Sequence, residues 1–161
     1  MPGAIASPSP TPRPMRALAW GGLLCGLLDT AAAGVVYGSL GVPLERLLQG
    51  IASGLLGPRA FAGGVATALL GLLLEFVIAF AAAAVYTGAA RAFAVLARHP
   101  IPAGLFYGIA VYWFMQLVVL PLSAYGRRPF SPRLTLIGIA IHMVCVGLPI
   151  ALAASRFSPH R

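Results

Sequence analysis

Four long apolar runs are the feature of this sequence that most limits how the chain can fold. Each run holds about 20 residues or more, and at about 1.5 Å per helical residue that length crosses the ~30 Å hydrocarbon core of a bilayer. Backbone amides and carbonyls inside hydrocarbon must bond to each other, which a helix achieves within one segment. The sequence therefore predicts four transmembrane helices, at about residues 17–40, 61–88, 103–124 and 134–155.

The composition indicates the same class of protein. Hydrophobic residues make up 60% of the 161-residue chain and charged residues only 9%, which is outside the usual range of soluble domains. The basic residues, all of them arginine, fall between the apolar runs, where cationic side chains anchor spans to lipid headgroups. The sequence has no basic face with interleaved aromatic residues. The composition therefore predicts the lipid bilayer as a partner and argues against nucleic acid.

The segments outside the spans differ in character. Residues 1–16 are rich in proline and serine without periodicity, as is typical of a disordered tail, and residues 157–161 form a short C-terminal tail. Residues 43–56, between the first two spans, place leucines at helical spacing and Glu45, Arg46 and Gln49 on the other side. We interpret this connector as a short amphipathic helix. An ordinary connector packed on the other helices is the alternative.

An even number of spans places both chain ends on the same side of the membrane. Arg13 and Arg16 flank the first span, and positively charged flanks favour the cytoplasm. The expected fold is an all-α membrane domain over residues 17–156, in which the four helices form an antiparallel bundle.

Small residues recur every four positions along the first span and again in the third. Such a stripe removes side-chain bulk and lets a second backbone approach closely. Packing within the bundle is one interpretation. The other is contact of the first span with a second copy of the chain or with another membrane protein. The glycines concerned are Gly22, Gly26, Gly34, Gly38, Gly104 and Gly108.

Two prolines lie late in the third and fourth predicted spans. Proline removes one helical hydrogen bond and frees a carbonyl about one turn earlier, and membrane helices accommodate this by local adjustment. The sequence predicts a kink at each of the two, Pro121 and Pro149.

Each predicted span also carries one strongly polar residue near its middle. An ionised group at the bilayer centre costs at least ~2.5–3.5 kcal/mol, and hydrogen-bond partners reduce that cost. Antiparallel neighbours bring their midpoints to the same depth. We therefore predict one polar cluster near the membrane midplane, with Cys25 and Cys145 one helical turn from two of its members. The four members are Asp29, Glu75, Gln116 and His142.

Three interpretations of this cluster stay open. It can be a hydrogen-bonded plug that only fixes helix packing, or a site that handles protons or a small solute. A metal site built from Asp29, Glu75 and His142 has sensible donors, but a lone histidine without HxxE or HxxxH spacing is weak support, so we predict no metal and no cofactor. The sequence contains no GxSxG, HExxH, phosphate-loop or CxxC motif, so it assigns no enzymatic activity, and an intramembrane enzyme stays a third interpretation behind the other two functions.

Five stretches of the chain are distinctive in sequence: LLD at 27–29, QGIASGLLG at 49–57, AFAGG at 60–64, MQLVVLPLSA at 115–124 and IHMVCVGLPIAL at 141–152. In these stretches the chain resembles a group of uncharacterised bacterial inner-membrane proteins with four spans. The layout is more distantly similar to that of the YagU-like proteins, whose function is unknown. The resemblance implies the bacterial cytoplasmic membrane and a four-span fold, and it implies no activity. That group often has His at the position of Glu75 and Asn at the position of Gln116, so the resemblance extends to polar residues at both positions but not to a shared histidine.

Overall fold

Every regular element is a helix within the residues that the computed structural model describes, which are 13–124 and 131–157. Two elements, η2 and η3, are π-helical, and η1 is a 3₁₀ helix. The elements in chain order are α1 (Arg13–Ser39), α2 (Leu44–Leu56), η1 (Gly57–Ala62), α3 (Gly64–Ala92), α4 (Ala94–Arg98), α5 (Pro100–Phe114), η2 (Met115–Val119), α6 (Leu120–Leu122), α7 (Pro132–Ile141), η3 (His142–Gly147) and α8 (Leu148–Phe157).

Four helices are long and apolar enough to cross a membrane, which confirms the predicted number and type of spans. The first two are α1 and α3. The third combines α5, η2 and α6, and the fourth combines α7, η3 and α8. They run over Pro14–Ser39, Gly64–Ala92, Pro100–Leu122 and Pro132–Phe157.

The boundaries differ from the predicted ones by a few residues. Helix α1 begins at Arg13, inside the predicted N-terminal tail, and α3 begins only at Gly64 because the residues before it form the 3₁₀ helix η1. Residues 1–12 of the predicted tail lie outside the described residues. So do residues 158–161 at the other end and residues 125–130 between the third and fourth spans.

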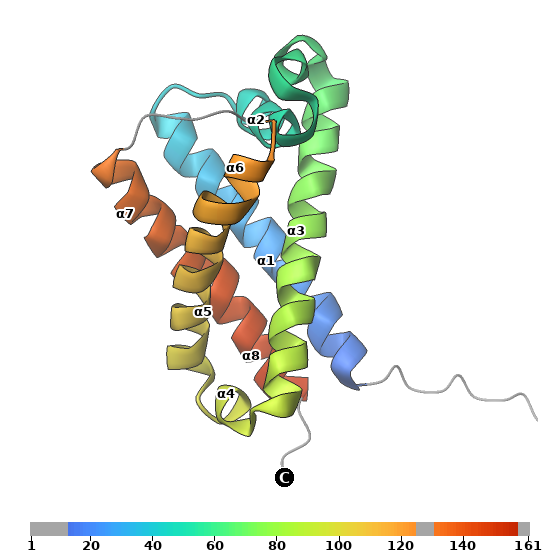
Figure 1. Ribbon diagram of the computed structural model, residues 1–161, viewed down its shortest axis with the longest axis vertical. Helices are drawn as coiled ribbons and strands as arrows, with labels where there is room; N and C mark the ends of the chain where they lie inside the picture. Colours follow the sequence, from blue (N-terminus) through green and yellow to red (C-terminus); the bar gives the residue numbers. More distant parts are fainter. Residues whose placement is uncertain (1–12, 125–130, 158–161) are drawn as a thin grey trace, which may run out of the picture.

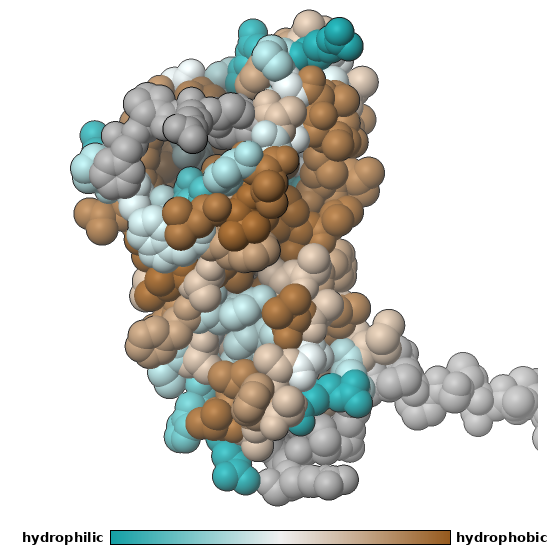
Figure 2. All heavy atoms as spheres, viewed as in Figure 1, coloured by the Kyte–Doolittle hydropathy of each residue, from teal (hydrophilic) through white to brown (hydrophobic). Residues whose placement is uncertain are grey.

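The membrane helices pack in a defined pattern. Helix α1 lies against both α3 and α8, and α5 lies against η3 and α8. The start of α1, the short α4 and the end of α8 lie at one end of the molecule, whereas α2, α6 and the start of α7 lie at the other (Figure 1). Brown hydrophobic side chains cover much of the visible face, and teal hydrophilic ones gather near its two ends, as expected of a surface that faces lipid (Figure 2).

The core is built mainly from alanines, which let helices approach closely. Cys25 and Ile150 are buried in it, together with the Tyr86 ring. The Tyr86 hydroxyl donates to the Leu96 carbonyl at 3.1 Å, and its ring meets that of Tyr107 edge-on, with centroids 5.0 Å apart. The Tyr107 hydroxyl in turn donates to the Ala82 carbonyl at 2.8 Å, which ties α5 to α3. The buried tyrosines thus keep their hydroxyls bonded in an otherwise apolar core.

The glycines of the third span allow the closest backbone contact with the fourth. A Cβ added at Gly104 would lie 2.9 Å from the Gly147 carbonyl oxygen, and one added at Gly108 would lie 2.6 Å from the carbonyl carbon of His142. Both distances are shorter than real Cβ contacts, so α5 rests on η3 only because these positions lack side chains.

The glycines of the first span have different surroundings. A Cβ added at Gly26 would lie 2.7 Å from the Phe76 ring, and a Cβ added at Gly22 would come similarly close to the Phe80 ring. Gly34 has only the tip of the Leu44 side chain nearby, at 3.5 Å, and Gly38 has nothing within 4 Å. The stripe is therefore filled by α3 at its first half and open at its second half.

Each predicted kink site follows a π-helical segment. The N–H of Leu120, one residue before Pro121, donates to the Met115 carbonyl five residues back, and the N–H of Leu148 donates in the same way to the Met143 carbonyl. Proline at 121 or 149 cannot donate and crowds the preceding turn. The wider i→i+5 turn accommodates this, so the irregularity takes the form of a π segment.

Helix α2 packs on the first half of α3. Gly71 of α3 meets the backbone of Leu48 directly, so the two helices touch without a side chain between them. Gln49 is 2% exposed, and its Nε2 donates to the Gly64 carbonyl at 3.1 Å and to Glu45 Oε1 at 3.2 Å. The side of α2 that packs on α3 thus buries Leu48 together with Gln49, a residue that the sequence places on the polar side, whereas Leu55 is exposed.

Candidate functional site: a carboxyl pair beside a pocket

The carboxyl groups of Asp29 and Glu75 lie within hydrogen-bonding reach of each other. Asp29 belongs to α1 and Glu75 lies near the middle of α3. The contact between Gly26 and the Phe76 ring lies next to both residues along their helices. Because glycine lets the two helices approach there, the acidic side chains meet instead of facing lipid separately. We call Asp29 and Glu75 the carboxyl pair.

The geometry of the carboxyl pair requires a proton. Two ionised carboxylates can only accept hydrogen bonds, so a bond between them needs one group to be protonated. Asp29 Oδ1 is buried and has no N–H or hydroxyl donor among the described residues. A proton on the Glu75 carboxyl would supply such a donor. Carboxyl groups that share one site commonly hold one proton between them.

Glu75 also lines a pocket of about 520 Å³ between α2, α3 and the end of the third span. Pockets of about 300–1,000 Å³ with mostly apolar walls and a few polar groups are the usual form of small-molecule sites. We call this cavity the α2 pocket. Its described lining residues are Tyr37, Val42, Arg46, Leu47, Gly50, Ile51, Gly54, Leu55, Phe61, Leu74, Glu75, Ile78, Met115, Val119, Leu120 and Ser123.

The two charged residues among those that line the α2 pocket differ in their surroundings. Arg46 is exposed, donates from Nη1 to the Phe61 carbonyl at 3.3 Å, and lies 5.7 Å from the centroid of the Phe61 ring. Glu75 is half-buried between the pocket and Asp29. Arg46 therefore marks the aqueous end of the pocket, and Glu75 marks its apolar interior.

The other two residues of the predicted midplane cluster have different surroundings. Gln116 is exposed, because its neighbour Met115 faces the pocket and one helical step turns the next side chain by about 100°. The ring nitrogen Nδ1 of His142 lies 2.9 Å from the Gly138 carbonyl oxygen, and the ring meets that of Tyr112 edge-on, with centroids 5.3 Å apart. The structure thus joins Asp29 with Glu75 and leaves Gln116 outside the pair.

The two cysteines are free thiols near the carboxyl pair. Cys25 is buried one turn before Asp29, and Cys145 is half-buried on η3. Both lie within electrostatic range of Asp29. Within residues 13–124 and 131–157, no three side chains of the His, Cys, Asp and Glu types form a group that could hold a metal ion.

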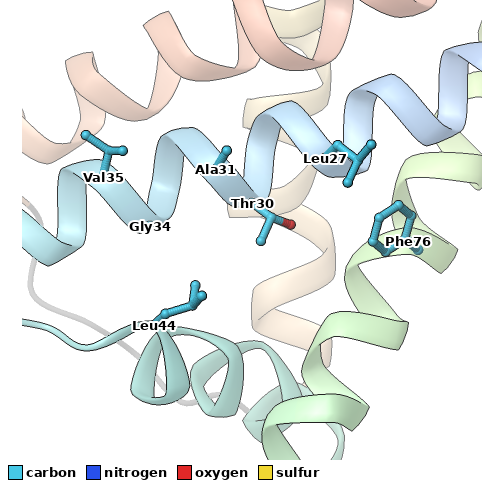
Figure 3. A pocket seen from close by; sticks show the side chains of 7 residues that line it. All are labelled: Leu27, Thr30, Ala31, Gly34, Val35, Leu44 and Phe76. Carbon is cyan, nitrogen blue, oxygen red and sulfur yellow. The ribbon is translucent and has the colours of Figure 1, made fainter.

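A second cavity, of about 460 Å³, lies between α1, the start of α2 and α3. Leu44 and Phe76 point into it toward α1, and the Thr30 side chain points into it from above (Figure 3). The Thr30 hydroxyl has no hydrogen-bond partner among the described residues. The lining is almost wholly apolar, so this cavity offers space for a lipid chain and no reactive group. The remaining lining residues are Leu27, Ala31, Gly34 and Val35.

Four apolar helices among the described residues are compatible with an integral membrane protein of the helical, multi-pass class, and two of them bring a carboxyl pair beside a pocket. Comparison of the chain with protein families, with curated proteins and with solved structures finds no match.

Proposed function

We infer that the protein handles protons or a small solute through the carboxyl pair. The observation that carries this proposal is the double position of Glu75, which contacts Asp29 on one side and lines the α2 pocket on the other. A proton that arrives through the pocket can bind at Glu75 without crossing the packed core. Ionisable residues within membrane spans are functional candidates by default, because an idle one would be costly to keep there.

Proton flux into liposomes tests the proposal. The purified chain is reconstituted with an entrapped pH-sensitive dye, and flux is measured after a pH step. Glu75→Gln keeps the size of the side chain and removes its exchangeable proton, so we expect flux to fall to that of protein-free liposomes. Gln116→Leu changes a polar residue outside the pair and serves as the control. Equal flux in the wild type and in folded Glu75→Gln would contradict the proposal.

The second candidate is a structural or accessory role, in which the pair only fixes helix packing. Its support is the location of the pair beside the close contact between Gly26 and Phe76, where a hydrogen bond would hold α1 against α3. Under this alternative, Glu75→Gln lowers thermal stability, and neither it nor the wild type conducts protons. Flux and melting measured on the same preparation therefore separate the two candidates.

We further propose that the four spans form an antiparallel bundle in the bacterial cytoplasmic membrane, with both chain ends in the cytoplasm and α2 lying as an amphipathic helix near the surface. The four apolar helices, the flanking Arg16 and the resemblance to four-span inner-membrane proteins support this placement. Accessibility of single cysteines, introduced at Ser39 and at Ser155, to an impermeant reagent tests the topology in whole cells. Labelling of both positions from the same side would contradict it.

A partner contact through the first span, with a second copy or another membrane protein, is proposed for one end of the glycine stripe. Gly22 and Gly26 are occupied by rings of α3, whereas Gly38 is open. Crosslinking from position 38 in membranes, compared with position 22, tests this. A dimer that forms equally from both positions would contradict the restriction to the open end.

A further inference from the structure

We propose that the α2 pocket binds an organic cation with an apolar body, with the positive group of the ligand beside Glu75. This inference rests on the proposed function in using the same carboxyl pair, but it requires binding and not proton flux. Its basis is the combination of pocket size, wall chemistry and the positions of the two charges.

The walls of the pocket select an apolar body. Leu74 and Ile78 of α3 face Met115 and Val119 of η2 across the cavity, and Ile51 of α2 covers it. These side chains offer no strong hydrogen-bond donor. A polar or strongly hydrated solute would lose its water there without replacement, whereas an apolar ligand would gain from burial. Met115 adds a flexible, polarizable surface that adapts to ligands of different shape.

The charges of the pocket determine which end of such a ligand goes inside. Arg46 lies at the aqueous end and repels a cation there, whereas the carboxyl pair with one shared proton retains one negative charge at the apolar end. A cationic group is therefore attracted past Arg46 to Glu75, and an anion of the same size is rejected by Glu75. The charged groups near Glu75 on the packed elements are Asp29 from α1 and Arg46 from α2, and the uncharged titratable ones are Cys25 and Tyr37 from α1 and Cys145 from η3.

The fold explains how a pocket persists between these helices. Gly50 and Gly54 of α2 face it without side chains, and the π segment η2 widens the third span opposite them. Ser123 and the carbonyl of Gly54, which accepts from the Ala124 N–H at 2.9 Å, hold the end of the third span against α2. The space therefore results from the backbone arrangement of α2 and the third span.

Equilibrium dialysis of the full-length chain in detergent tests the proposal. The probes are tetraphenylphosphonium, a permanent cation, and tetraphenylborate, an anion of nearly the same shape, with protein-free micelles as the blank. We expect saturable binding of the cation at one site and weaker binding of the anion. The double variant Asp29→Asn/Glu75→Gln removes the negative charge of the carboxyl pair and should weaken cation binding on the order of 30-fold, because the attraction between two buried charges is lost. Glu45→Gln, which changes an exposed acid outside the pocket lining, should leave it within about twofold.

Two outcomes overturn the inference: equal binding of both probes, or equal cation affinity of the wild type and the double variant Asp29→Asn/Glu75→Gln. If the double variant does not accumulate as folded protein, Met115→Trp decides, because it fills the pocket and leaves the carboxyl pair intact. Unchanged cation affinity in Met115→Trp also overturns the inference. Cation binding without proton flux would refute the proposed proton handling alone. Flux without cation binding would refute this inference alone.

Discussion

Gly108→Ala should destabilise the protein, because α5 and η3 touch there through their backbones. The new Cβ would lie 2.6 Å from the carbonyl carbon of His142 and 2.6 Å from the Cα atom of Met143. Ordinary contacts begin near 3.4 Å, so the two helices must separate by roughly 0.8 Å. A gap of that size forfeits about a quarter to a half of the dispersion energy of the atoms across it, and overpacking in such sites costs about 1–3 kcal/mol.

The helix itself gains from the same substitution, since alanine is favoured over glycine by about 1 kcal/mol in a helix. Gly88→Ala isolates this gain, because Gly88 lies in α3 with nothing within 4 Å of its added Cβ. We therefore expect Gly88→Ala to be neutral or slightly more stable and Gly108→Ala to be less stable, by about 1–3 kcal/mol relative to Gly88→Ala. Circular dichroism during unfolding in mixed micelles measures the difference. Equal stability of the two variants would refute the close contact between α5 and η3.

Three further predictions concern individual hydrogen bonds and side-chain positions. In a double-mutant cycle, Asp29→Asn and Glu75→Gln should show a coupling of about 0.5–3 kcal/mol in unfolding free energy, and additive effects would argue against their contact. Tyr107→Phe removes the bond to the Ala82 carbonyl, which also lies within the helical ladder of α3, and should lower the unfolding free energy by about 0.5–1.5 kcal/mol, the net contribution of one hydrogen bond; a melting curve unchanged from wild type would contradict this. Gln116→Leu replaces an exposed side chain that faces lipid, so the melting temperature should stay the same or rise, whereas a large fall would mean that Gln116 has a partner within the protein.

The spans were predictable because membrane insertion depends on a one-dimensional property, the length of an apolar run. The spacing of Gly104 and Gly108 also pointed to a close backbone contact in the right helix, and α5 makes that contact with η3. Both features are local, since each is visible within one segment of the chain.

The direction of a side chain around its helix was harder to predict than its depth. Gln116 is exposed because the packed stripe of the third span runs through Gly108, Tyr112 and Met115, one residue away. The opposite error concerns Gln49 of α2. The sequence places Gln49 on the polar side of an amphipathic helix, yet its side chain is buried because the first turn of α3 offers the Gly64 carbonyl as a partner.

The α2 pocket could not be predicted because residues from six helical elements line it, namely α1, α2, η1, α3, η2 and α6. Its signs in the sequence were indirect: the proline at 121, which required a wider turn before it, and the pair Gly50 and Gly54 in the connector. The same elements explain how the site can be both apolar and accessible. The contact of Gly26 with Phe76 brings Asp29 to Glu75 in the packed half of α3, whereas η2 and α2 keep the other side of Glu75 open. A carboxyl in a closed core could only fix helix packing, and one on the lipid face would only add the free-energy cost of a polar group in hydrocarbon. Because Glu75 lies at the boundary between core and cavity, its carboxyl can both exchange protons and contact a ligand in the pocket.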